Sequence, residues 1–395
     1  MNSILIINAG SSSIKFAVYD ADKLSNEPPP PPEVSGEIDR IGLESSTFTF
    51  HILGKSQTEK VALSKNTFNS AIEVLVNWLK DEAKFTPPKT IGHRIVHGMQ
   101  FYKPELITNE LLAKLRLIRP FDPEHLPSEL DIIEALMKRY PSARQVACFD
   151  TAFHHSMPNV AKLLPIPRRY FAQGIQRYGF HGLSYSFLLE ELVRLREPSA
   201  TSGRVILAHL GSGASIAAVK DGKCIDTSMA FTPASGLMMG TRSGDIDPGI
   251  EPFLAKSEEL SSHKFLQMIN HDSGLLGVSE TSSDMQDLLK IETEDFRAHE
   301  AIEMFCHQAK KWIGGFAAIL GGIDCLTFAG GIGENAPLVR ARICKGLEFL
   351  GLHIDHGSNL KNSEVISLPS SQISVRVIRT NEELMIAKYT IRTSL

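Results

Sequence analysis

The chain has 395 residues, which is long enough for two domains that each bury a hydrophobic core. Its hydrophobic fraction of 43% and charged fraction of 22% are typical of globular proteins and disfavour disordered and fibrous classes. Lysine and arginine together number 41 against 45 acidic residues, giving a net charge of −4. Because this charge is small, we expect no overall field that recruits nucleic acid or a membrane, and any anion site must be local.

The cysteines and the lengths of the apolar runs indicate the cellular compartment in which the protein is expected. The five cysteines are scattered, form no CxxC pair and are odd in number, which argues against a disulfide framework or a zinc site. The sequence begins MNSILIINAG without a basic leader, and no apolar run reaches the roughly 18 residues that a membrane span needs. We therefore expect a cytoplasmic protein without a membrane segment.

The first residues predict a β-hairpin. Residues 3–8 are an apolar run, AGSSS is a turn, and residues 14–20 are a second strand. The prolines at 28–32 cannot join a sheet ladder, so we expect a stiff surface loop there rather than a partner-binding motif.

Two helices and a buried strand are predicted next. Apolar residues between 72 and 79 recur at helical spacing, and a second helix is expected to start at Ser128 and stop at Pro141. Residues 145–149 then read as a short buried strand that ends at Asp150.

The middle of the chain repeats its beginning. At an offset of 201 residues, ILIINAGSSSIKFAVYD matches VILAHLGSGASIAAVKD, and both segments predict a strand, a small-residue turn and a strand. The alignment places Gly10 on Gly211 and Ala17 on Ala218, at the turn and at inward strand positions. We interpret this as a trace of internal duplication, with two unrelated hairpins as the alternative.

The last third predicts alternating helices and strands. Residues 300–320 form a long helix, 323–328 a strand and AGGIGEN a glycine turn, after which Pro337 opens another helix. A final strand is expected at 374–378, and Thr380 is expected to cap the last helix.

Three glycine-rich turns are candidate phosphate sites. NAGSSSIKF and HLGSGASI each leave backbone N–H groups free between two strands, and AGGIGEN precedes a helix, whose N-terminus favours anions. One such turn alone is usually only a turn, but three in one chain favour phosphate binding. The GxxxxGK[ST] loop is absent, and no GxGxxG follows a strand, so those two nucleotide folds are not supported.

Basic and imidazole side chains stand among glycines in GHRIVHG, RRYGFHG and GLMMGTRSGDIDPG. Side chains in such settings suit a loop that reaches a cleft better than a core, although each one alone could be a solvated arginine or a buried structural histidine. The side chains are His93, Arg94, His97, Arg177, His181 and Arg242.

Carboxylates at two places are further candidates. Asp150 ends an apolar strand, where its carboxylate is expected to face a cavity or to cap the next segment. In TNEE, Thr380 and Glu383 have the spacing of a capping box, which leaves Glu382 as the freer ligand for a metal ion.

These segments together resemble the acetate kinase family of short-chain carboxylate kinases. The matching segments occur in family order over nearly the whole chain, and they are NAGSSSIKF, GHRIVHG, FDTAFH, RRYGFHG, HLGSGASI, GLMMGTRSGDIDPG, AGGIGEN and TNEELMIA. The resemblance implies an α/β fold of two related domains with a central cleft, of the actin, hexokinase and heat-shock ATPase type (a ribonuclease H-like duplication). It also implies ATP or ADP as co-substrate, Mg²⁺ or Mn²⁺, and a homodimer.

The resemblance also implies roles for individual residues. The residues that the resemblance implies for phosphoryl transfer are Asp150, Arg242, His181, Arg94 and His125. The implied nucleotide-binding residues are Lys15, Ser11, Ser12, His209, Leu210, Gly211, Ser212, Gly213, Asp284, Met285, Gln286, Gly331, Ile332, Gly333, Glu334 and Asn335. Arg94 would hold the substrate carboxylate, and the pocket for the acyl tail would contain Val96, Phe180 and Pro233. The implied metal-associated residues are Asn8 and Glu382.

The sequence departs from the family pattern around substrate and nucleotide. In PFDPEHLPSEL, Glu124 replaces an apolar residue and Leu126 a polar one, while Ser212 stands where asparagine is common. Gln286 replaces an arginine, Leu183 and Tyr185 replace polar residues, and Ala234 and Ser235 replace a Leu-Glu pair. An ionised Glu124 in the acyl pocket would repel the substrate unless it points away or pairs with a base.

The predicted function is ATP-dependent phosphorylation of a short-chain carboxylate, with acetate favoured and propionate as the nearest alternative. A catalytically altered nucleotide-binding protein of the same fold is the alternative from another class. The predicted partners are a small carboxylate and a second copy of the chain, without nucleic acid or membrane. The expected domains are 1–150 with 380–395, and 151–379, the latter with the nucleotide site and the dimer interface.

Overall fold

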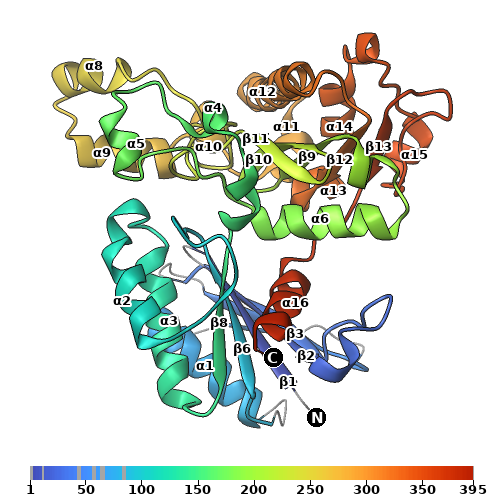
Figure 1. Ribbon diagram of the computed structural model, residues 1–395. Helices are drawn as coiled ribbons and strands as arrows, with labels where there is room; N and C mark the ends of the chain where they lie inside the picture. The colour runs from blue at the N-terminus through green and yellow to red at the C-terminus, as the bar shows by residue number, and fades with distance from the viewer. Residues whose placement is uncertain are drawn as a thin grey trace. The chain divides into compact units, whose positions relative to one another are not determined.

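The computed structural model describes residues 3–10, 13–41, 46–55, 59–62, 67–81 and 86–394. The chain divides into two compact units, Met1–Ala152 with Asn381–Leu395, and Phe153–Thr380. Each unit is a mixed α/β structure built on one sheet (Figure 1). Within the described ranges, no helix has the length and apolar character needed to cross a membrane.

The sheet of the first unit has eight strands in its described part, in the order β5-β4-β3-β2-β1-β6-β8-β7. Strand β1 pairs antiparallel with β2 and parallel with β6, and β6 pairs parallel with β8. The strands are β1 Ser3–Ala9, β2 Ile14–Asp20, β3 Val34–Asp39, β4 Thr47–Ile52, β5 Glu59–Ala62, β6 Thr90–Ile95, β7 Glu105–Leu106 and β8 Arg144–Phe149.

Helices cover both faces of this sheet (Figure 1). Helices α1 and α3 bury Leu75 and Ile132 with Leu5 of β1 in one hydrophobic core. The last helix, α16, packs on β1, β6 and β8 so closely that a Cβ atom at Gly92 would lie 2.8 Å from Ile386. The helices of this unit are α1 Phe68–Asp81, α2 Asn109–Leu117, α3 Leu126–Arg139 and α16 Glu382–Ser394, with 3-10 turns η1 Ala21–Lys23 and η2 Arg119–Phe121.

The second unit contains a five-stranded sheet in the order β11-β10-β9-β12-β13. Strand β9 pairs antiparallel with β10 and parallel with β12, and β12 pairs parallel with β13. The strands are β9 Arg204–Leu210, β10 Ala214–Lys220, β11 Lys223–Thr227, β12 Cys325–Ala329 and β13 Ser374–Val377.

The longest helix of the second unit, α12, packs on β9 and β10 and ends at Gly321 in the left-handed conformation, φ 74°. Helix α6 also contacts β9, and the two helices lie on opposite sides of the sheet in Figure 1. The helices are α4 Asn159–Lys162, α5 Arg169–Ala172, α6 Gly182–Arg194, α7 Ser199–Ser202, α8 Ile250–Ser257, α9 Ser262–His271, α10 Gly274–Ser279, α11 Met285–Ile291, α12 Phe296–Leu320, α13 Gly330–Asn335, α14 Pro337–Cys344 and α15 His356–Leu360, with 3-10 turns η3 Ala152–Ser156 and η4 Glu348–Leu350.

The two sheets share a topology, which supports the internal duplication. In each sheet an antiparallel hairpin is extended by two parallel strands, β1-β6-β8 in one and β9-β12-β13 in the other. The offset of 201 holds for the first strands, β1 and β9, but β10 starts only 200 positions after β2 because the second turn is one residue shorter. The predicted match of Ala17 with Ala218 is therefore wrong, since the register pairs Ile6 with Ala17 but Leu207 with Ala217.

Most predicted elements are confirmed, with differences at their ends. The proline run 28–32 lies in irregular structure between η1 and β3, as predicted. The helix expected from Ser128 begins earlier, at Leu126. The turn AGGIGEN contains the short helix α13. Asn381, and not Thr380, caps α16, since Asn381 Oδ1 accepts a hydrogen bond from the Leu384 N–H at 2.9 Å.

Candidate functional site

Two glycine turns meet at one edge of the second sheet. Residues 211–213 follow β9 and Gly330 follows β12, and both strands are parallel, so their carboxyl ends lie together. Gly330 has φ 78°, and a Cβ atom there would lie 2.6 Å from the Leu210 carbonyl oxygen. Only glycine allows this close approach of the two backbones, which leaves a narrow surface of backbone groups suited to phosphate.

His181 and Arg242 lie against the first of these turns. A Cβ atom at Gly213 would be 3.3 Å from His181 Nε2 and 3.9 Å from Arg242 Nη1. Two groups that can donate hydrogen bonds therefore converge on one glycine. Arg242 is held in place by the Pro233 carbonyl oxygen, which accepts a hydrogen bond from Nη1 at 2.9 Å.

His181 is held by an unusual backbone and by polar neighbours. It stands at the N-terminus of α6 with φ 59°, a left-handed conformation that is costly for a residue with a side chain. Its Nδ1 lies 2.8 Å from Ser215 Oγ, which also contacts the Tyr185 hydroxyl. Its ring stacks on His209 at 4.2 Å between centroids. The strained backbone and these contacts together fix the ring that faces Gly213.

The remaining segments implied for the nucleotide join the same edge. The Gly240 N–H donates to the Ser212 carbonyl oxygen at 2.9 Å, and a Cβ atom at Gly240 would lie 3.1 Å from the Ser283 carbonyl oxygen. Ser283 directly precedes Asp284–Gln286 at the start of α11, where Asp284 is the N-cap. The structure thus brings together the turn at His209–Gly213, the start of α11 and the turn at Gly331–Asn335.

Two residues implied for nucleotide binding shape the second turn through their side chains. Glu334 Oε1 accepts hydrogen bonds from the backbone N–H groups of Gly330 at 2.9 Å and Thr380 at 3.0 Å. Asn335 Nδ2 donates to the Gly331 carbonyl oxygen at 2.9 Å. These contacts stabilise the conformation of the turn.

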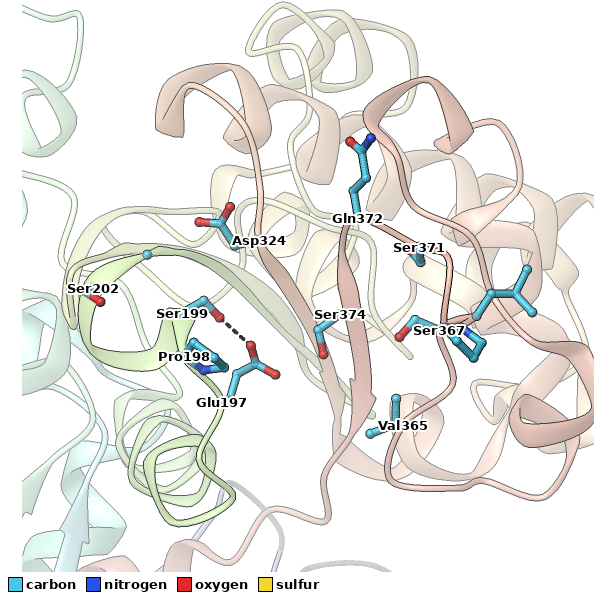
Figure 2. Close-up of a pocket in the computed structure, with 13 residues that line it drawn as sticks. Glu197, Pro198, Ser199, Ser202, Asp324, Val365, Ser367, Ser371, Gln372 and Ser374 are labelled. Atoms are coloured by element: carbon cyan, nitrogen blue, oxygen red, sulfur yellow. Dashed lines mark hydrogen bonds between the residues drawn. The ribbon is translucent and has the colours of Figure 1, made fainter.

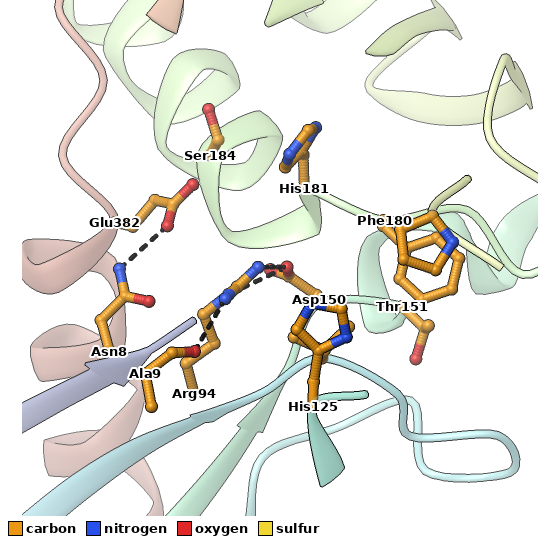
Figure 3. Close-up of polar contacts among 12 residues, drawn as sticks. Asn8, Ala9, Arg94, His125, Asp150, Thr151, Phe180, His181, Ser184 and Glu382 are labelled. Carbon is orange, nitrogen blue, oxygen red and sulfur yellow. Dashed lines mark hydrogen bonds and ion pairs between the residues drawn. The ribbon is translucent and has the colours of Figure 1, made fainter. Parts of the chain in front are cut away.

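Arg94 and Asp150 form an ion pair in the first unit (Figure 3). They lie at the carboxyl ends of the parallel strands β6 and β8. Arg94 Nη2 and Nε donate to Asp150 Oδ2 at 2.6 and 3.0 Å, and Nη1 donates to the Ala9 carbonyl oxygen at 3.1 Å. Burial would lower the pKa of Arg94, but the negative charges of Asp150 and Glu382 outweigh this, so its pKa is raised and the side chain stays charged.

Asn8 and two glutamates gather between β1 and the start of α16. Asn8 Nδ2 donates to Glu382 Oε2 at 3.0 Å and to Glu383 Oε1 at 2.8 Å, and Figure 3 shows the first of these contacts. The capping box predicted for Thr380 and Glu383 is wrong, because the Thr380 N–H donates to Glu334 Oε1 and Asn381 caps the helix. An amide oxygen and a carboxylate are ligands that Mg²⁺ accepts when phosphates and water supply the others. No group of three or more His, Cys, Asp and Glu side chains within the described ranges could hold a metal ion unaided.

Lys15 lies on the same face, in a cavity of about 460 Å³ that Glu37 and Glu383 also line. Burial would lower the pKa of Lys15, but the negative charges of Glu37 and Glu383 outweigh it and raise that pKa. Ser11 and Ser12, two further residues implied for the nucleotide, lie outside the described residues.

His125 belongs to a buried polar cluster in the first unit that the sequence revealed only in part. Asp122 Oδ1 lies 2.8 Å from His125 Nδ1, and Glu129 accepts a hydrogen bond from the Val96 N–H at 3.1 Å. Asp122 and Glu129 were missed by sequence reasoning. Their positions three residues before and four residues after His125, around a predicted helix start, are the signal that could have identified them.

Several candidates prove to be structural. His93 is fully buried against Gln145, and burial lowers its pKa to about 4. Arg177 Nη1 donates to three backbone carbonyl oxygens of residues 227–229. Leu126 lies in the hydrophobic core, whereas Glu124 is exposed. The change at Leu126 is thus a core substitution, while Glu124 does not add a charge to the core. Val96 and Phe180 are buried.

A separate cavity of about 710 Å³ lies in the second unit (Figure 2). Glu197, Ser199, Asp324 and Ser374 line it, at or next to the amino ends of the parallel strands β12 and β13. The glycine turns stand at the carboxyl ends of β9 and β12, so this cavity is at the opposite end of the sheet and does not belong to the candidate phosphate site.

A sheet edge of glycine turns with a nearby arginine and histidine, on an α/β unit whose topology is duplicated, is suited to binding a phosphate group. A family model described as the acetokinase family matches residues 3–388. An acetate kinase of Rhodopseudomonas palustris (strain TIE-1) is 39% identical to this chain. The alignment covers 98% of this chain and 97% of that protein. An acetate kinase of Bacillus subtilis (strain 168) is also 39% identical, over 99% of both chains.

Two solved structures are similar over the whole length. Porphyromonas gingivalis acetate kinase has a TM-score of 0.89 at 34% identity and covers 100% of both chains. A propionate kinase from Francisella tularensis subsp. tularensis SCHU S4 has a TM-score of 0.90 at 36% identity and covers 99% of both. The chain belongs to the acetokinase family. It is a phosphotransferase with a carboxyl group as acceptor and ATP or ADP as co-substrate, which confirms the prediction from the motifs.

Proposed function

We propose that the protein transfers the terminal phosphoryl group of ATP directly to acetate, giving acetyl phosphate and ADP. The observation that carries this proposal is the convergence of His181 Nε2 and Arg242 Nη1 on the Gly213 turn. Two hydrogen-bond donors at a phosphate turn suit the negative charge that spreads over the equatorial oxygens during transfer.

The reaction needs positioning more than proton removal. A small carboxylic acid has a pKa close to that of Asp or Glu, about 4, and is ionised at neutral pH. One carboxylate oxygen forms a bond to the γ-phosphorus while the bond from that phosphorus to the bridging oxygen breaks. The electron pair leaves with ADP, so no proton is transferred in the step.

Each candidate residue receives a role on this basis. Arg94 holds the acid through its planar guanidinium, which Asp150 orients, and Val96, Phe180 and Pro233 surround the acyl tail. Arg242 and His181 stabilise the transferring group, and His125 belongs to the same proposed set of catalytic residues. The turn at His209–Gly213 and the turn at Gly331–Asn335 hold the nucleotide.

A magnesium ion fits the oxygens of Asn8 and Glu382, which we propose as its protein ligands. When bound, the ion neutralises charge on the phosphates. Asn8 Nδ2 holds the Glu382 carboxylate at 3.0 Å and so keeps the amide and the carboxylate side by side.

The test is hydroxylamine trapping of acyl phosphate with ATP and magnesium across acetate, propionate and butyrate. We expect the highest kcat/KM with acetate. A higher value with propionate would favour the propionate alternative, which the similar solved structures leave open because one is an acetate kinase and the other a propionate kinase. Tight ATP binding without any acyl phosphate would favour a catalytically altered protein, for which the comparisons give no support.

We also propose a homodimer in the cytoplasm, as the family resemblance implies. One chain has a mass of 43.5 kDa. Light scattering of the purified protein is expected to give twice that mass. A monomeric mass at micromolar concentration would contradict this expectation. Fractionation of cells is expected to recover the protein with the cytosol.

A further inference from the structure

We propose that Asp122 is a positioning residue that fixes the orientation of the His125 ring and keeps the proton of that ring on Nδ1. The proposal rests on the role given to His125 in the proposed function. Nothing in the motifs or in the family comparison assigns Asp122 a part in the reaction.

The contact between the two side chains is short and buried. Asp122 Oδ1 lies 2.8 Å from His125 Nδ1 and 3.3 Å from the His125 backbone nitrogen, which donates to it. Asp122 is 4% exposed and His125 is 7% exposed. Asp122 lies in the turn between η2 and α3, and His125 is the residue before α3 begins. The same carboxylate oxygen therefore contacts both the backbone nitrogen and the ring of His125.

The charge of the cluster is concentrated on Asp122. Burial would raise the pKa of Asp122, but the hydrogen bond and charge of His125 outweigh it, and that pKa is lowered. Glu129 has the opposite behaviour, because burial and the negative charge of Asp122 raise its pKa well above the usual range. Environments that shift the pKa values of two carboxyl groups in opposite directions favour the ionised form of one and the neutral form of the other. Asp122 is the ionised acceptor, and the neutral form is favoured for Glu129.

An ionised carboxylate can only accept hydrogen bonds, so the proton between Asp122 and His125 belongs to Nδ1 of the imidazole. The other ring nitrogen, Nε2, then points away from Asp122. Glu129 also senses the charges of Arg94 and Asp150, which places the cluster in the same electrostatic region as the ion pair. Figure 3 draws His125 together with Arg94 and Asp150. Because Asp122 Oδ1 contacts both the ring and the backbone nitrogen of His125, we assign the effect of Asp122 to the placement of His125.

A double-mutant cycle separates this role from simple support of the helix start. Asp122→Ala is expected to lower kcat about a hundredfold, the usual cost of a misplaced catalytic group, while the KM values for acetate and ATP change little. In a His125→Gln background, the same substitution is expected to have no further effect on kcat. Asp122→Asn keeps an oxygen that accepts from Nδ1 and should retain most of kcat. Asp131→Ala, at an exposed position of α3, is the matched control.

Equal losses from Asp122→Ala in both backgrounds would overturn the proposal, as would wild-type kcat in a folded Asp122→Ala protein. NMR of ¹⁵N-labelled histidine gives a readout that does not depend on activity. The His125 ring should carry its proton on Nδ1 in the wild type and in Asp122→Asn, and Asp122→Ala should change that signal. An Nδ1 without a proton in the wild type also overturns the proposal. Failure of the proposed function would instead appear as a wild-type protein that forms no acyl phosphate.

Discussion

The guanidinium of Arg94 binds one oxygen of Asp150 through two nitrogens, at 2.6 and 3.0 Å. The arginine proposed to hold the acid is therefore already oriented by a protein carboxylate that is itself fully buried. The Asp150 side chain then fixes the plane of Arg94, as expected when strands β6 and β8 end side by side. The Arg94 side chain is therefore ordered before the acid binds, so binding does not carry the free-energy cost of ordering it.

Replacement of Arg94 by lysine is expected to weaken binding of the acid. Lysine keeps the charge but loses the planar fork, and a charged hydrogen bond contributes about 1.5–3 kcal/mol. The KM for acetate should rise at least about tenfold, while the KM for ATP stays close to that of the wild type. Steady-state kinetics measure both constants. Arg116→Lys, at an ion pair on the surface, is the control, and an unchanged KM for acetate in Arg94→Lys would refute the role.

Removal of the Arg242 side chain is expected to lower kcat by about 10²–10³, the range for loss of one transition-state donor. Its contacts include the Pro233 carbonyl oxygen and the sulfur of Met239, and we expect the variant to remain folded, with a melting temperature above the assay temperature. Kinetics and calorimetry on Arg242→Ala test both statements. A kcat near the wild-type value would show that Arg242 does not act on the transferring group.

Tyr185→Phe is expected to loosen His181. The Tyr185 hydroxyl contacts Ser215 Oγ, which lies 2.8 Å from His181 Nδ1, and Tyr185 and Ser215 are fully buried. Loss of one buried hydrogen bond should lower the free energy of unfolding by about 1 kcal/mol and lower kcat several-fold. Urea unfolding and kinetics give the two values. Tyr102→Phe, at an exposed tyrosine, should change neither, and the same kcat in both variants would contradict the link to His181.

Glu382→Gln is expected to raise the magnesium concentration that gives half-maximal activity, because a neutral amide binds a hard cation more weakly than a carboxylate. Titration of activity with Mg²⁺ at saturating ATP measures this shift. Glu383→Gln is the matched comparison, since Asn8 binds both carboxylates. If the larger shift came from Glu383→Gln, the assignment of the two glutamates would have to be exchanged.

The raised pKa of Glu129 predicts a dependence of stability on pH. Because the folded state holds its proton more tightly than the unfolded state, stability is fully present below the ordinary glutamate pKa of 4.5 and falls as the pH rises toward the pKa of the folded state. Glu129→Gln, which is always neutral, should remove this fall. Urea unfolding at pH 5 and pH 8 should show a smaller difference for the variant than for the wild type. A similar flattening in the half-exposed Glu134→Gln would rule out Glu129 as its source.

Local sequence patterns predicted the elements well where one signal dominated. The hairpin of β1 and β2 and the strand β8 follow from apolar runs bounded by small residues. Helix ends were predicted less well, because two neighbouring polar residues can each cap a helix. Thr380 contacts Ser184 instead, and Asn381 caps α16. The one-residue shift of β10 relative to β2 could not be predicted, because the sequence does not distinguish a turn of three small residues from a turn of four.

The sequence by itself determined the family, because glycines, arginines and histidines in fixed spacing leave a readable pattern, and the same pattern predicted the glycine turns and the candidates Arg94, Asp150, His181 and Arg242. Only the tertiary structure decided what holds them. The contacts of His125 with Asp122 and of His181 with Ser215 and Tyr185 depend on how helices and strands pack. The contact of Asn8 with Glu382 joins residues 374 positions apart. Burial and distance set the charge of such groups, and neither can be read from the order of residues along the chain.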